Sequence, residues 1–175
     1  MTFNGLKYVL GLLLALQFGP QCFAQQNIFV QFDTSAFICT GAGNKEASGF
    51  SAVSSVGFGA TDTVTHSVSG DFPGKPMFPD IKLAKTLDDC TPDILNSLAR
   101  GKIFNTVKIE ILKTTPTGMV IHALDILLKR VIITSDAFTD DASGQPSEVI
   151  TLDWTQISVT EGTKVFTWNR ATNTP

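Results

Sequence analysis

The sequence predicts a mainly β protein, a β-sandwich or small barrel covered by one short helix. Several segments alternate apolar and polar residues with the two-residue period of a strand. Phenylalanine is the dominant aromatic residue, with 13 copies, and the 14 glycines and many β-branched residues also favour a globular β protein. Only one stretch, KTLDDCTPDILNSLARGK at residues 85–102, carries the signals of a helix.

The first 24 residues predict a secretory signal peptide. Lys7 is the only charge among them, and a mostly apolar run follows at Tyr8–Phe18 before Pro20 breaks it. This run is about half the length of roughly 20 residues that a membrane-spanning helix needs. A lipoprotein signal at Cys22 is the alternative, but the preceding Gly-Pro-Gln is a poor approach to a lipidated cysteine. We expect cleavage near Ala24 and a secreted or periplasmic product without stable membrane insertion.

The mature chain at residues 25–175 has the length of one domain with a sizeable core. Its charge is mildly negative and no basic patch stands out, so nucleic acid is not an expected partner. Removal of Cys22 leaves Cys39 and Cys90 in an oxidising compartment. A single disulfide between them is the economical interpretation, and two buried free thiols are the alternative.

Before the helix, the chain predicts three strands and one long connection. In NIFVQFD, every second residue from Ile28 is apolar, which gives a strand with one apolar face. The polar segment at residues 61–76 contains several Gly, Ser and Pro residues and predicts a long loop or an irregular hairpin. The three predicted strands span residues 27–33, 50–59 and 80–87.

The helix is predicted from its ends and its apolar spacing. Thr91 can cap it, Pro92 suits its first turn, and Asp93 complements the positive end of its dipole. Arg100 falls in the last turn and Gly101 is a natural terminator. The predicted apolar face consists of Ile94, Leu95 and Leu98.

After the helix, strands resume. The segment at residues 120–135 is long enough for one bent strand or two, and residues 136–146 predict a loop. In the segment at residues 148–161, the apolar phase slips after Trp154 to Ile157, which indicates a bulge or a change of buried face. The other predicted elements are strands at residues 105–113 and 164–170 and a turn at residues 115–118.

The sequence shows no constellation that carries chemistry. His66 lies in the polar segment and His122 in a predicted strand, and neither belongs to a cluster with metal-ligand spacing. The acid pairs Asp88-Asp89 and Asp140-Asp141 are more typical of a helix entrance or a solvated loop than of acid–base catalysis. No nucleophile elbow or phosphate-binding loop occurs. We therefore expect no enzyme activity, no catalytic residue, no metal site and no cofactor.

Three stretches occur in an order that points to one family: DIKLAKTLDDCTPDILNSLARGK (80–102), ALDILLKRVIITSDAF (123–138) and GQPSEVITLDWTQISVTE (144–161). Together they resemble the haemolysin-coregulated protein (Hcp) family, the tube protein of type VI secretion systems. With its predicted signal peptide, this sequence would be an exported member of that family. The positions that match the family's pattern are Pro92, Leu95, Gly101, Lys102, Pro146, Glu148, Leu152, Trp154 and Ile157.

The resemblance implies a compact barrel of two antiparallel sheets with one flanking helix, and a hexameric ring whose copies stack into a hollow tube. It implies a lumen-facing helix surface formed by Asn96, Ser97 and Arg100. A loop at about residues 39–49 would contact the adjacent ring, or be an ordinary mobile loop. Its candidate stacking residues are Gly41, Gly43, Asn44, Lys45 and Glu46. A bond from Cys90 to Cys39 would attach the helix entrance to this loop.

The leading functional hypothesis is a structural protein that assembles with itself into rings, and further into tubes that carry or chaperone effectors. Secreted effectors or a spike protein are the other partners that the resemblance implies. The alternative is a monomeric secreted β-barrel binding module that kept the fold without the assembly.

Overall fold

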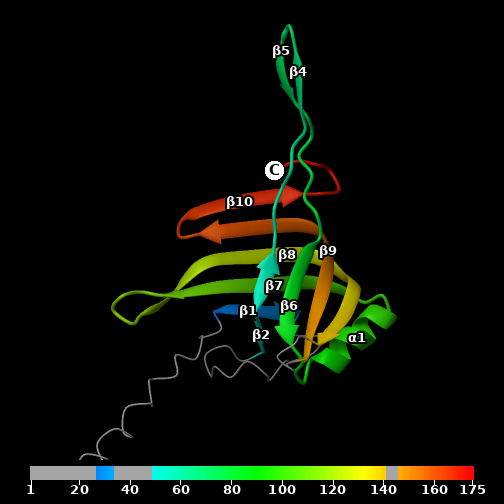
Figure 1. Cartoon of the computed structure of the whole chain (residues 1–175), viewed down its shortest axis with the longest axis vertical. Helices are drawn as coiled ribbons and strands as arrows, with labels where there is room; N and C mark the ends of the chain where they lie inside the picture. Colours follow the sequence, from blue (N-terminus) through cyan, green and yellow to red (C-terminus); the bar gives the residue numbers. More distant parts are fainter. Residues whose placement is uncertain (1–26, 34–48, 141–145) are drawn as a thin grey trace, which may run out of the picture.

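The computed structural model describes residues 27–33, 49–140 and 146–175, and there the chain is mainly β with one short helix, which confirms the predicted fold class. Figure 1 shows a curled sheet from which one thin hairpin projects. The described elements are β1 (Ile28–Phe32), β2 (Ser51–Val53), β3 (Ser55–Gly57), β4 (Val64–Ser67), β5 (Gly70–Pro73), β6 (Ile81–Thr86), α1 (Thr91–Ala99), β7 (Ile103–Thr114), β8 (Val120–Asp140), β9 (Pro146–Glu161) and β10 (Lys164–Asn169).

The strands form one large antiparallel sheet and one small hairpin sheet. The large sheet has the order β2-β1-β7-β8-β9-β6-β3, with β10 also paired to β9, and β4 pairs only with β5. Along the edge of β9 away from β8, residues 147–152 pair with β6 and residues 156–161 pair with β10. β2 also contacts β6. The large sheet therefore curls into a nearly closed barrel, which encloses one of its faces.

A corner crosses three neighbouring strands of this barrel. Leu128 and Val131 of β8 are both buried although they are three residues apart, and their partners on β9, Ile157 and Trp154, are buried in the same way. Arg130, between the two β8 positions, has a φ of 53°, in the left-handed region. The phase slip predicted near Trp154 is thus a change of buried face. The matching buried positions on β7 are Val107 and Phe104.

One apolar cluster fills the barrel. It contains fully buried side chains from the long strands, and α1 adds Ile94 to it. Phe32 and Phe104 meet there with their ring centroids 5.1 Å apart. Each such side chain contributes about 1.5–3 kcal/mol through burial, so this cluster is the main source of stability.

Several predicted boundaries differ from the structure. The predicted strand at residues 50–59 is two short strands, β2 and β3, which pair with β1 and β6 respectively. β8 is a single strand that continues to Asp140, so the loop predicted at residues 136–146 is wrong for residues 136–140. The strand continues because residues 135–140 pair with residues 146–151 of β9. Of the two options for residues 61–76, the structure has the hairpin, β4–β5.

The helix α1 lies where it was predicted, but its cap and its buried face differ. The helix begins at Thr91, and the N-cap position belongs to Cys90, which makes no side-chain capping bond, so the expected Thr91 cap is wrong. Ile94 and Ser97 are the buried residues of the helix, whereas Leu95 is 43% exposed. Gly101 has a φ of 59°, the left-handed conformation expected of a helix terminator.

The predicted signal peptide lies outside the described residues. Within residues 27–33, 49–140 and 146–175, no helix has both the length and the apolar character needed to cross a membrane.

Candidate assembly surfaces

The hairpin β4–β5 stands away from the barrel at the end of two extended arms (Figure 1). All eight residues of its strands are exposed. The arms are held together where Thr61 and Met77 form an isolated bridge, and where the Gly74 amide donates to the Thr63 carbonyl over 2.6 Å. A Cβ atom at Gly74 would lie 2.5 Å from that carbonyl oxygen, so the close approach of the arms requires glycine here.

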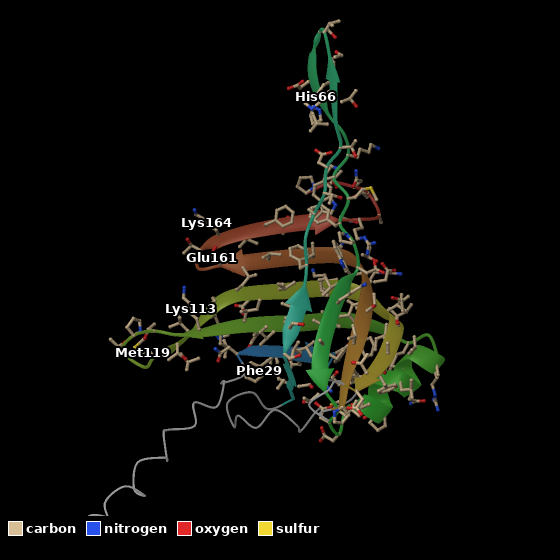
Figure 2. The ribbon with its side chains drawn as sticks, in the orientation of Figure 1. Phe29, His66, Lys113, Met119, Glu161 and Lys164 are labelled. Atoms are coloured by element: carbon tan, nitrogen blue, oxygen red, sulfur yellow. The ribbon has the colours of Figure 1, made fainter. Side chains whose placement is uncertain are left out.

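Apolar side chains are concentrated on this projecting hairpin. Val68 at its tip is fully exposed, Phe72 is 54% exposed, and Met77 in the arm is 69% exposed. His66 and Asp71 face each other across the two strands, and His66 Nδ1 lies 2.7 Å from Asp71 Oδ1. Figure 2 labels His66 on the hairpin. A two-stranded ribbon without a core is marginally stable in water, and exposed apolar groups favour contact with another molecule.

β10 is the open edge of the large sheet. Among the described strands it pairs only with β9, and its neighbouring residues Val165 and Phe166, which point to opposite faces, are 61% and 42% exposed. Behind it, Phe78 packs against Trp168 at 5.0 Å and Phe166 at 5.9 Å between ring centroids. An unpaired strand presents a row of backbone donors and acceptors, which another strand can complete.

The chain after β10 is held to the barrel by Arg170. Its guanidinium donates to Asp153 over 2.7 Å and to Asp80 over 3.1 Å, and it lies 4.8 Å from the centroid of the Trp154 ring. A small cavity of about 240 Å³ lies between β8, β9 and β10. Its lining residues are Leu127, Lys129, Gln156, Ile157, Ser158, Thr167, Trp168, Asn169 and Pro175. It is smaller than the usual range for small-molecule sites.

The helix residues predicted to face a lumen do not share one surface. Asn96 and Arg100 are exposed, but only 4% of Ser97 is accessible because it lies on the face that α1 packs against the barrel. Ser97 is therefore removed from that set. The five candidate stacking residues at positions 41–46 lie outside the described residues, and so does Cys39. Cys90 is buried at the start of the helix, where the predicted disulfide would have to reach it.

A buried cluster of charged groups lies beside the helix start. Lys85 of β6 and Glu148 of β9 are fully buried and directly opposite each other, and the lysine Nζ lies 2.6 Å from Glu148 Oε1. The same Nζ lies 2.7 Å from Asp88 Oδ1 and donates to the Thr86 carbonyl over 3.0 Å. Lys85 therefore forms ion pairs with two carboxylates, those of Glu148 and Asp88.

Other elements attach to this buried cluster by hydrogen bonds. Thr91 donates its hydroxyl hydrogen to Glu148 Oε1 over 2.8 Å, and Ser51 of β2 donates to Asp88 Oδ2 over 2.6 Å. The Cys90 amide donates to Asp88 Oδ1 over 2.9 Å. Asp88 thus marks the helix entrance, as predicted for the Asp88-Asp89 pair. The cluster joins β2, β6 and β9 to the first turn of α1.

Asp136 of β8 is the third carboxylate near this lysine. Its two oxygens are buried without a hydrogen-bond partner among the described residues, and so is Glu148 Oε2. The pKa of Asp136 is raised from its ordinary value of 3.8 to about 6, first by burial and then by the negative charge of Glu148, while Lys85 partly opposes the rise. The sequence offered a signal for this cluster, because Lys85 and Glu148 continue the apolar phases of their strands.

The comparisons with known proteins agree with this fold. The family model described as "Type VI secretion system effector, Hcp" matches residues 39–160. No curated protein matches the sequence significantly. The solved "Crystal structure of Hcp protein" has a TM-score of 0.70 at 16% identity, and the alignment covers 81% of this chain and 98% of that chain.

Two further solved structures show the range of the likeness. A mutant of Hcp1 from an E. coli EAEC pathovar has a TM-score of 0.69 at 12% identity, covering 81% of this chain and 95% of that one. The cap that terminates the anti-feeding prophage tube has a TM-score of 0.52 at 12% identity, covering 79% and 90%. These likenesses establish the fold, and the family match spans well over half of the sequence. The chain therefore belongs to the Hcp family of type VI secretion system proteins.

Proposed function

We propose that the mature chain is a structural protein of the tube type, which assembles into hexameric rings that stack into a tube. The observation that carries this proposal is the projecting hairpin β4–β5, which is exposed along its whole length and presents Val68 and Phe72 to solvent. Family membership and the solved Hcp structures support a tube-like structural role. The ring, the stacking and any effector cargo are the proposed parts.

The hairpin supplies one half of a contact between unlike surfaces. A ring closes when a patch on one copy meets a different patch on the next copy and the rotation returns to the start. The hairpin reaches far beyond its own barrel (Figure 1), so its partner surface lies on another molecule. We assign it to the contact between stacked rings, in addition to the loop residues 41–46, which lie outside the described residues.

The open edge of β10 supplies the contact within the ring. A strand from a neighbouring copy can pair with Lys164–Trp168, which removes the hazard of an exposed edge and buries Val165. Asn96 and Arg100 of α1 remain the candidates for a polar lumen surface that would meet secreted effectors or a spike protein.

Light scattering of the mature protein after size-exclusion chromatography tests the ring. We expect a species of six times the monomer mass, with annuli in negatively stained electron micrographs. A monomer that persists at high concentration would overturn the assembly and support the monomeric secreted binding module. N-terminal sequencing of the exported protein should begin at Gln25 if the signal peptide is cleaved as predicted.

Two variants separate ring formation from stacking. Val165→Lys places a charge on the β10 edge and should convert hexamers to monomers, while Val165→Thr should keep them. Phe72→Asp on the hairpin should abolish stacking and leave the ring intact. The matched control is Met119→Asp, at the tip of the β7–β8 hairpin labelled in Figure 2, where a 63% exposed side chain should tolerate the change. Equal loss of stacking in both aspartate variants would refute the hairpin assignment.

A further inference from the structure

A group of metal-ligating side chains lies on the outer face of β7 and β8, two strands in from the β10 edge assigned to the ring contact. Glu110, His122 and Asp125 each offer one ligand atom, and these three atoms lie within 4.8 Å of one another. The three residues come from two strands and are separated by up to 15 positions, so no short sequence motif announces them.

The register of the two strands explains how two acids come together. Glu110 of β7 is directly opposite Asp125 of β8. Like charges at directly opposed positions of an antiparallel pair destabilise it, unless a cation lies between them. Lys108 of β7 is ion-paired with Glu110, while the described contacts of Asp125 are with His122. Glu110 and Asp125 together carry two negative charges against the one positive charge of Lys108, so the local charge favours a further cation.

A β-bulge brings the histidine to the same place. The register shifts between Ile111 and Leu112, so that Leu112 is opposite His122, where an uninterrupted ladder would place Ala123. The shift turns His122 to the face that carries Glu110 and Asp125, and its Nδ1 lies 2.9 Å from Asp125 Oδ1. Bulges are a known means of re-aiming one side chain at a functional site.

We propose that Glu110, His122 and Asp125 form a binding site for one divalent transition-metal ion, with Zn²⁺ as the preferred occupant. One imidazole nitrogen and two carboxylate oxygens are a donor set that suits Zn²⁺, and water would complete a tetrahedral shell. Ligands of tetrahedral Zn²⁺ lie about 3.3 Å apart, so ligand atoms that are up to 4.8 Å apart need to approach one another by up to about 1.5 Å. Half of the His122 side chain is exposed, which leaves a path for the ion.

The second group of potential ligands, Asp88, Asp89 and Cys90, does not support the same inference. Asp88 is already occupied by Lys85 and by Ser51, and Cys90 is buried in the core cluster. The hairpin pair of His66 and Asp71 has no third carboxylate in such a group among the described residues. It is a natural control, because it reproduces the His–Asp contact without the complete set.

Isothermal titration of the untagged mature protein with Zn²⁺ tests the site. We expect saturation at one ion per chain and an increase of Tm with Zn²⁺. His122→Ala should weaken the affinity about tenfold or more and remove the Tm shift, since even the loss of an outer partner of a metal ligand typically costs 10–100-fold. Lys108→Gln should strengthen binding because it frees Glu110. Excess Mg²⁺ should not displace the ion, because imidazole is a poor ligand for it.

The control variant His66→Ala should bind Zn²⁺ as the parent protein does. The proposal is overturned if the parent protein does not bind Zn²⁺, if His122→Ala binds it unchanged, or if both histidine variants lose the same affinity. Because His122 is exposed, its variant should keep the circular dichroism spectrum of the parent, so loss of binding can be separated from loss of fold.

Discussion

Lys85 is the residue on which the local balance of charge depends. It is fully buried between Glu148 and Asp88, and Asp136 adds a third carboxylate nearby. Removing one partner of a buried ion pair leaves an uncompensated charge in a medium that solvates it poorly. The neighbouring hydrogen bonds of Thr91 and Ser51 make the cluster a junction between the barrel and the helix.

A Lys85→Met substitution should therefore be strongly destabilising. We expect the free energy of unfolding to fall by about 3–5 kcal/mol, because Glu148 and Asp88 lose the buried lysine that they share. Chemical denaturation at pH 7 measures this. The double variant Lys85→Met with Glu148→Gln should recover part of the loss, and simple additivity of the two changes would contradict the proposed coupling.

The raised pKa of Asp136 predicts how stability depends on pH. Between its unfolded value near 4 and its folded value of about 6, the native state binds more protons than the unfolded state. The free energy of unfolding should thus decrease as pH rises from 4 to 6, by roughly 1–2 kcal/mol after allowance for solvent screening, and this contribution stays lost above pH 6.

Asp136→Asn should remove that decrease and make the protein more stable than the parent at pH 7.5, with little difference at pH 4. Denaturation midpoints across this range measure it, and Ser135→Asn on the same strand is a neutral control. A parent-like pH profile in Asp136→Asn would show that another group is responsible.

For single residues, the sequence alone predicts which charged side chains of this cluster are buried. Lys85 follows Ile81 and Leu83 with the two-residue period, and Glu148 precedes Ile150, so strand periodicity places both inside. What the sequence could not give is that they are opposite each other, because that register depends on strands 63 positions apart. Glu110 and His122 were missed for a similar reason, since a bulge within β8 sets their meeting.

Among the elements, the corner across β7, β8 and β9 shapes the barrel most directly. Arg130 of β8 takes a φ of 53° there, a conformation that costs an L-residue with a side chain about 1–2 kcal/mol. The conformation persists because buried cross-strand pairs lie on either side of it along the strand, Leu128 with Ile157 and Val131 with Trp154.

Arg130→Gly should stabilise the protein by about 1 kcal/mol, because glycine adopts this backbone conformation without steric cost. Arg130→Val should destabilise it, since a β-branched residue is poorly tolerated at positive φ. The comparison of the two by thermal denaturation is informative because Arg130 is exposed and both variants remove the same charge. The opposite order would contradict the assigned strain.

The helix shows where periodicity alone was insufficient. The apolar spacing predicted a face of Ile94, Leu95 and Leu98, but the structure turns Ser97 inward and Leu95 outward. The buried stripe runs through Cys90, Ile94 and Ser97, and small residues at its ends suit a close approach of helix to sheet. The packing of α1 against the barrel, and not the hydrophobicity of its residues alone, therefore decides which face of the helix is buried. The ends of the helix, which depend on Pro92 and Gly101, were predicted well.

For the whole molecule, the fold class followed from composition and strand periodicity, whereas the length of β8 did not. Residues 136–140 contain polar and acidic residues that favour a loop, yet their pairing with β9 keeps them in the strand. β9 pairs with three strands, β6, β8 and β10. Its register with each of them depends on how the barrel curls, which no local sequence pattern reveals.

The proposed Cys39–Cys90 disulfide should stabilise the exported protein. A closed loop of about 50 residues corresponds to roughly 4 kcal/mol in the chain-entropy account. We expect a lower Tm in reducing agent, and no alkylation of either cysteine until the protein is unfolded and reduced. Alkylation of Cys39 in the unfolded, unreduced protein would rule the bond out. Cys90→Ala alone is a poor test, because Cys90 is also part of the buried core.

The corner also has a mechanical consequence. Since β7, β8 and β9 pass through it without a break, the two walls of the barrel share their backbone ladders and are not joined merely by side-chain packing. At this corner there is no seam along which the two walls can slide apart. A force applied to one wall would be transmitted to the other through the shared strands, so the two walls should move as one rigid unit.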